Sequence, residues 1–561
     1  MNLAGLITFW ALVLAAYAVL PEYWKFRIKA LIGSGGAILS TAIALLLSLW
    51  LVSWSMFMSD GYWKIGVQIA AFLVLLLYVA FLVIRLFRGK LTKDNLQRFR
   101  ELVSSLSINR QYEILTKVIK DNIEYLPVIY NYQPRPRRLL PFKKSKLEVK
   151  GLPWQPRPVS KYQEEVLKFV DQIVSDRGFT AFVVNYDIDT PLSLIETCEN
   201  QLYGVAEYLD TVLEFLISNP DSQLYREIQR NQNIGWGGRR EFSNSRLLKF
   251  LFRNAELAKK RAIWKPIGNY VTRFLHDRPG GAEDIYNKEA SYYTDSSTTD
   301  RFSDPVFVGL EFFDFMVKEA LLQRVTWHMW LYYFHHWTRE IVGKLHYAPD
   351  EWERGYWEYP TRYAFLLYGV VDYQLRWFDC ARESDLDINL EKGEIDINAN
   401  ILQSAAKCLA YCLRSICECK ELPDKFKRSL LALWWNHYFE LEIWKKNNYP
   451  QYAQFMLESL VSEVEGIYGK HTSFPLLGCI VSGLTHVDEI KEWVNNQTYK
   501  DRLSDMEQLL RQHVVPALEA TSPEMRSHAL GSMLGTEFKL DDNTILVTNR
   551  FNRWTSLLDL A

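Results

Sequence analysis

The chain has 561 residues, a formal net charge of −1 and a hydrophobic content of 48%. The near-equal numbers of acidic and basic residues exclude a generally basic nucleic-acid binder. The length is ample for an anchor and two or three further domains. All seven cysteines follow residue 88. An odd cysteine count without a disulfide framework favours a reducing compartment for this part of the chain.

Three strongly apolar runs lie at the start of the chain. They cover residues 3–20, 31–54 and 65–84, and the second is interrupted only by Gly, Ser and Thr. Each has about the 20 residues that cross a hydrocarbon core of about 30 Å. No basic residue precedes the first run and no small-x-small cleavage site follows it, which disfavours a signal peptide. The sequence therefore predicts a three-helix transmembrane anchor over residues 1–88.

Basic residues are unevenly distributed between the loops of this anchor. The first loop carries Lys25, Arg27 and Lys29, the second carries Lys64, and a further basic cluster follows the third run. Positive charge favours the cytoplasmic side of a membrane. We therefore expect an integral protein of a bacterial inner (plasma) membrane, with its N-terminus outside and residues 89–561 in the cytoplasm.

Small residues recur every four positions in the second apolar run. Small side chains at this spacing allow close approach of helix backbones in lipid. The partner is either another helix of the same chain, which is the favoured interpretation, or a helix of a second subunit in a homo-oligomer. A pore lined by Ser and Thr is a third interpretation. The predicted packing positions are Gly36, Ser40, Ala44 and Ser48.

Helical periodicity dominates the rest of the chain and predicts a mainly α fold. We divide it into a juxtamembrane helix and basic Pro-rich linker at 89–158, a helical domain with a Gly-rich basic segment at 159–304, and an aromatic-rich helical C-terminal domain at 305–561. Alternating residues around turn signals predict small β-hairpins at 385–398 and 538–548.

Residues 235–278 are the most charge-biased soluble segment. A glycine-rich loop opens it, and eleven basic residues stand against three acidic ones, a local net charge of +8. Consecutive glycine amides can surround an anion, and arginine forks bind phosphate. The sequence therefore predicts a site for a phosphate-bearing ligand, with a solvated surface or a protein-binding face as alternatives. Its residues are Gly235, Gly237, Gly238, Arg239, Arg240, Arg246 and Lys249.

Residues 279–304 are rich in Gly, Ser, Thr and Asp, which predicts a mobile loop after the basic segment. Earlier in the chain, the apolar run 179–184 favours a strand or a buried turn before Asp187 and Asp189. No P-loop, nucleophile-elbow or His-Glu-x-x-His motif occurs. No catalytic residue is therefore predicted.

Histidines and cysteines gather on two predicted helices. Aromatic neighbours of the histidines favour structural roles over a metal site, and the cysteine spacing favours small buried side chains. No metal or cofactor is predicted. The residues concerned are His328, His335, His336, Glu340, Cys408, Cys412, Cys417 and Cys419.

These features predict a membrane-anchored sensor or effector that is homo-oligomeric and non-enzymatic. Its cytoplasmic part would receive a nucleotide or nucleic acid at the basic segment, and by analogy of architecture a bacterial defence or stress response is a fitting setting. One alternative is a membrane-tethered enzyme acting on nucleic acid or a phosphorylated substrate. A second alternative is a scaffold that recruits a soluble partner protein.

Overall fold

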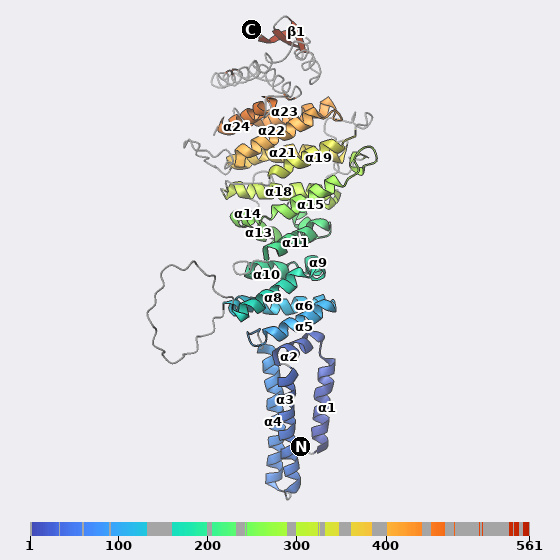
Figure 1. Cartoon of the computed structure of the whole chain (residues 1–561), viewed down its shortest axis with the longest axis vertical. Coiled ribbons are helices and arrows are strands. Elements are labelled where there is room, and N and C mark those ends of the chain that lie inside the picture. The colour runs from blue at the N-terminus through green and yellow to red at the C-terminus, as the bar shows by residue number, and fades with distance from the viewer. Residues whose placement is uncertain are drawn as a thin grey trace, which may run out of the picture. The chain divides into compact units, whose positions relative to one another are not determined.

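The computed structural model divides into two compact units, Met1–Phe215 and Leu216–Ala561 (Figure 1). The structure describes residues 3–32, 34–58, 61–88, 91–131, 160–198, 205–231, 242, 244–288, 299–323, 325, 331–346, 361–383, 401–439, 450–465, 476, 504, 508, 538–541, 544–548 and 554–559. Helices make up almost all of the described regular structure, which confirms the mainly α prediction. The predicted hairpin at 385–398 lies outside the described residues.

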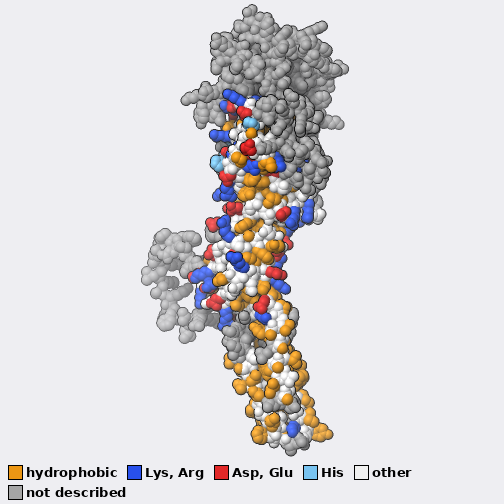
Figure 2. Space-filling view, turned by 90° about the vertical axis from the view of Figure 1, so that its right-hand side faces the viewer, with side chains coloured by type: hydrophobic (Ala, Val, Ile, Leu, Met, Phe, Trp, Pro, Cys, Tyr) orange, Lys and Arg blue, Asp and Glu red, His pale blue; other side chains and the backbone are white. Residues whose placement is uncertain are grey.

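Four helices form the N-terminal part of the first unit: α1 (Leu3–Val19), α2 (Glu22–Ile32), α3 (Ser34–Phe57) and α4 (Tyr62–Arg88). Helices α3 and α4 pack along each other, and α1 contacts α3. In Figure 2, hydrophobic side chains cover the visible face of this lower end, whereas acidic and basic side chains are spread over the described body.

The prediction of three membrane spans is wrong by one. Among the described residues, two helices are long and apolar enough to cross a membrane, over Leu39–Phe57 in α3 and Tyr62–Phe81 in α4. Helix α1 is as apolar, but its 17 residues rise only about 25 Å, less than the hydrocarbon thickness of about 30 Å. The chain then bends by 116° between α1 and α2, so α2 does not lengthen the apolar helix in the same direction.

The remaining helices of the first unit are short. Hydrophobic side chains on one face of each are buried, as Leu96, Phe99, Val103 and Leu106 are in α5. These helices are α5 (Leu96–Ile108), α6 (Tyr112–Asn122), η1 (Ile123–Tyr125), α7 (Leu126–Tyr130), α8 (Lys161–Ser175), α9 (Arg177–Tyr186), α10 (Asp189–Cys198) and α11 (Val205–Ser218), whose last three residues belong to the second unit.

Local capping residues explain where several of these helices begin. The Ser160 hydroxyl accepts a hydrogen bond from the Gln163 amide, and the Gln163 side chain accepts one from the Ser160 amide, which forms a capping box for α8. The Asp176 carboxylate accepts the Phe179 amide at the start of α9. The apolar run 179–184 is therefore helical, and the expected strand or turn is wrong, because short apolar runs do not distinguish the two structures.

The second unit contains most of the remaining helices. They are α12 (Gln223–Asn231), α13 (Arg246–Phe252), α14 (Ala255–Lys260), α15 (Trp264–His276), α16 (Ile285–Lys288), η2 (Thr299–Ser303), α18 (Pro305–Leu322), α19 (Leu331–Lys344), α21 (Arg362–Glu383), α22 (Ile401–Glu418), α23 (Asp424–Phe439) and α24 (Pro450–Glu465). Three strands, β1 (Phe538–Asp541), β2 (Thr544–Thr548) and β3 (Trp554–Asp559), pair antiparallel in that order.

Helix α18 lies at the centre of the aromatic core of this unit. It packs against α15 and α21, and its residues from Val306 to Val317 are all buried. The Phe313 ring meets the Trp337 ring of α19 edge to face at 5.1 Å. Edge-to-face pairs of this kind add about 0.5–1.5 kcal/mol each beyond the area that they bury.

Helices α15 and α19 run parallel and touch once every turn. The Tyr333 hydroxyl donates to the Asn269 side chain at 2.8 Å, and one turn later the Trp337 indole N–H donates to the Thr272 hydroxyl at 3.0 Å. A Cβ atom at Gly268 would lie 2.4 Å from the Tyr333 ring. Glycine at this position is therefore required for the close approach of the two helices.

Candidate functional site

The structure places part of the predicted phosphate site on α13. Arg246 and Lys249 are exposed there, and so is Arg253, which follows Lys249 by four positions at the end of the helix. Because residues three and four apart share one face of a helix, these cations form a single stripe, here called the α13 basic stripe. The other predicted site residues, Gly235, Gly237, Gly238, Arg239 and Arg240, lie outside the described residues.

The apolar side of α13 and its first amides are turned inward. The carboxylate of Glu227, which is fully buried in α12, accepts the backbone amides of Leu247 at 3.2 Å and Leu248 at 2.9 Å. Burying a carboxylate against amides at the start of a helix satisfies both partners. These amides are therefore already engaged, and the stripe can meet a ligand only through its side chains.

Several cations of the 235–278 segment have structural roles. The Arg261 guanidinium is buried and lies 4.5 Å from the centre of the Phe250 ring. The Arg278 guanidinium pairs with Asp284, a buried carboxylate that lies outside the segment. Part of the local charge of +8 is therefore buried or paired within the fold. The count of charged residues in the sequence did not reveal this.

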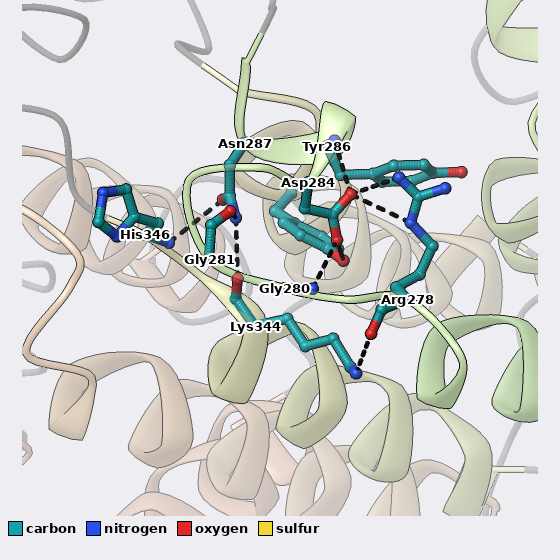
Figure 3. Close-up of polar contacts among 9 residues, drawn as sticks. Arg278, Gly280, Gly281, Asp284, Tyr286, Asn287, Lys344 and His346 are labelled. Atoms are coloured by element: carbon teal, nitrogen blue, oxygen red, sulfur yellow. Dashed lines mark hydrogen bonds and ion pairs between the residues drawn. The ribbon is translucent and has the colours of Figure 1, made fainter.

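A polar cluster that the sequence did not predict surrounds Asp284 (Figure 3). The Asp284 side chain is fully buried, and it pairs with the Arg278 guanidinium. It also accepts the Tyr363 hydroxyl at 2.8 Å and the amides of Gly280 at 3.2 Å and Tyr286 at 3.0 Å. Burial by itself would raise the pKa of Asp284, but Arg278 and the other donors hold it below its usual value.

The same cluster fastens the loop between α15 and α16 to the end of α19. The Asn287 side-chain amide donates to the carbonyls of Gly281 at 2.9 Å and Lys344 at 2.8 Å. The Lys344 ammonium in turn donates to the Arg278 carbonyl at 2.5 Å. Residues 279–288 are thereby held in place, so the predicted mobile loop is wrong for this part of 279–304. The polar groups of this cluster are hydrogen-bonded to one another. The cluster therefore has a structural role, in which it holds the loop against the end of α19.

Two of the four predicted packing positions are buried on α3, which packs along α4. Ala44 is 6% exposed and Ser48 is fully buried, and on α4 the side chains of Ala71 and Leu75 are fully buried. The Ser48 hydroxyl donates to the Leu45 carbonyl at 2.8 Å, which removes a polar group from the interface. Ser40 is half-buried, and the surroundings of Gly36 lie outside the described part of the chain.

Aromatic side chains lie near the turn of the α3–α4 hairpin and on both sides of the bend between α1 and α2. Trp54, Tyr62 and Trp63 are exposed near the turn that joins the two helices. Tyr17 is exposed at the end of α1, and the half-buried Trp24 follows in α2. Trp and Tyr gather at the two water interfaces of membranes, because their rings combine an apolar body with a polar edge.

His335 and Cys412 lie in packed surroundings, and Asp187 forms a partly exposed ion pair. His335 lies against the Tyr411 ring, and its pKa is lowered to about 4, first by burial and then by nearby cations. The Cys412 sulfur accepts the Thr338 hydroxyl at 3.3 Å inside the core. Asp187 pairs with Lys120 at 2.6 Å.

Within the described ranges, no group of three or more His, Cys, Asp or Glu side chains could hold a metal ion; His328 lies outside these ranges. Among the sequence-predicted features that the structure describes, the α13 basic stripe and much of the α3–α4 hairpin have exposed side chains. No family model, curated protein or solved structure matches the chain.

Proposed function

We propose that the chain is a membrane-anchored sensor or effector that binds a phosphate-bearing ligand through the α13 basic stripe. The α3–α4 hairpin would hold the protein in the membrane, and the helical body would lie in the cytoplasm. The apolar lengths of α3 and α4 and the exposed aromatic side chains near the turn of the hairpin support the anchoring.

The observation that carries the ligand proposal is the exposure of Arg246, Lys249 and Arg253 on one face of a helix whose opposite face is buried. Like charges at this spacing repel one another by a few tenths of a kcal/mol per pair. A bound anion offsets that repulsion. The preceding basic residues, Arg239 and Arg240, would add to the same electrostatic attraction.

The proposal predicts salt-sensitive binding that depends on the stripe. The full chain in lipid nanodiscs should bind a fluorescent single-stranded oligonucleotide, and affinity should fall as salt rises because counterions are released. Replacing Lys249 and Arg253 by Gln should weaken binding and reduce the salt slope by about one for each phosphate-binding cation removed. A fluorescent mononucleotide tested in parallel should show a shallower salt dependence, because it carries few phosphate charges.

The matched control is Lys407→Gln with Lys420→Gln, which removes two exposed cations of the same unit at a distance in sequence from the stripe. Equal binding by the wild-type chain, the stripe variant and the control would contradict the proposal. So would the absence of binding to both ligands at low salt.

A further inference from the structure

We propose that α2 lies in the plane of the membrane surface and binds the headgroups of anionic phospholipids. The proposal rests on the proposed membrane anchoring and adds a lipid class that the protein should prefer. It concerns the first unit only.

The position of α2 in the first unit places it at headgroup depth. The chain turns by 116° between α1 and α2, so α2 does not continue the direction of α1. Helix α2 contacts α3 and α4 on one side and α5 and α6 on the other (Figure 1). A helix between the ends of the spanning hairpin and the first helices of the body lies where lipid headgroups meet water.

Contacts with the body fix which side of α2 faces away from it. The Phe26 ring meets the Phe99 ring of α5 at 5.6 Å, the Tyr23 hydroxyl donates to the Asp121 carboxylate of α6, and the Lys117 ammonium lies 4.4 Å from the Tyr23 ring. Tyr23 and Phe26 are accordingly buried. On the rest of the helix Trp24, Lys25 and Arg27 are half-buried, and Glu22 is exposed.

The composition of α2 suits a membrane interface, and within it Lys25 pairs with Glu22 at 2.9 Å. The sequence of α2 contains Lys25, Arg27 and Lys29 against Glu22, a net charge of +2. The Arg27 guanidinium lies 5.6 Å from the centre of the Trp24 ring. Stacked Trp and Arg side chains suit the headgroup layer, where apolar and charged surroundings meet. Excess positive charge selects anionic over zwitterionic headgroups.

The test measures which lipids the full chain retains. The chain is reconstituted in nanodiscs of equal parts phosphatidylglycerol and phosphatidylcholine, and the lipids bound to it are identified by native mass spectrometry. We expect phosphatidylglycerol to be enriched on the wild-type chain. Replacing Lys25 and Lys29 by Gln should lower its apparent affinity by up to about fivefold for each cation removed.

Two single substitutions complete the design. Glu22→Gln raises the net charge of α2 and should increase the retained phosphatidylglycerol. Lys64→Gln removes a cation at the opposite end of the α3–α4 hairpin and should leave it unchanged. Equal loss with Lys64→Gln, or no change in any variant, would overturn the proposal. Failure of the wild-type chain to enter nanodiscs at all would instead contradict the proposed anchoring.

Discussion

At Asp284 one buried carboxylate connects the end of α15, the start of α16 and the start of α21. Replacing it by Asn would leave the Arg278 guanidinium, only 19% exposed, without a counter-charge. Removing one partner of a buried pair costs 3–5 kcal/mol, and the slight exposure of Arg278 places the expected loss of unfolding free energy at about 3 kcal/mol. Denaturation of the detergent-solubilised chain measures this loss.

The matched control is Asp277→Asn, which changes an exposed carboxylate nearby and should stay within about 0.5 kcal/mol. The pH dependence gives a second criterion. Because the folded pKa of Asp284 is lowered, its stabilising contribution is present above its ordinary pKa of about 3.9 and is lost as pH falls through the folded value. Asp284→Asn should abolish this loss of stability at low pH. If the pH dependence of the free energy of unfolding were unchanged, the cluster would contribute little to stability.

At the scale of helices, we expect the α3–α4 interface to depend on small side chains. Ser48 is fully buried there, whereas Ser53 of the same helix is exposed. Ser48→Leu should force the two helices apart and lower thermal stability in detergent, at a cost of about 1–3 kcal/mol. Ser53→Leu makes the same chemical change at an exposed position of α3. It should have little effect on thermal stability. Similar melting temperatures for both variants would mean that the predicted row of small residues does not support this interface.

At the scale of the whole chain, the two proposed spans would place residues 22–32 and the body on one side of the membrane and the turn after α3 on the other. In intact cells, Ser59→Cys should react with a membrane-impermeant maleimide. Ser175→Cys, on the exposed face of α8, should react only after permeabilisation. The wild-type chain serves as background, because all seven native cysteines follow α4. The opposite labelling pattern would reverse the proposed orientation. The predicted external N-terminus depended on a third span and stays a prediction.

The sequence alone determined the features that repeat within a few turns of chain: the mainly helical fold, the apolar lengths of α3 and α4, and the exposed cations at Arg246 and Lys249. These follow from hydrophobic periodicity and charge, which neighbouring residues express together. The tertiary structure decided the contacts between distant residues. Asp284 accepts a hydrogen bond from Tyr363, which lies 79 positions later in the chain. Glu227 accepts hydrogen bonds from the first amides of α13, which lie about 20 positions later. No local pattern encodes such partners, because they become neighbours only when the helices pack.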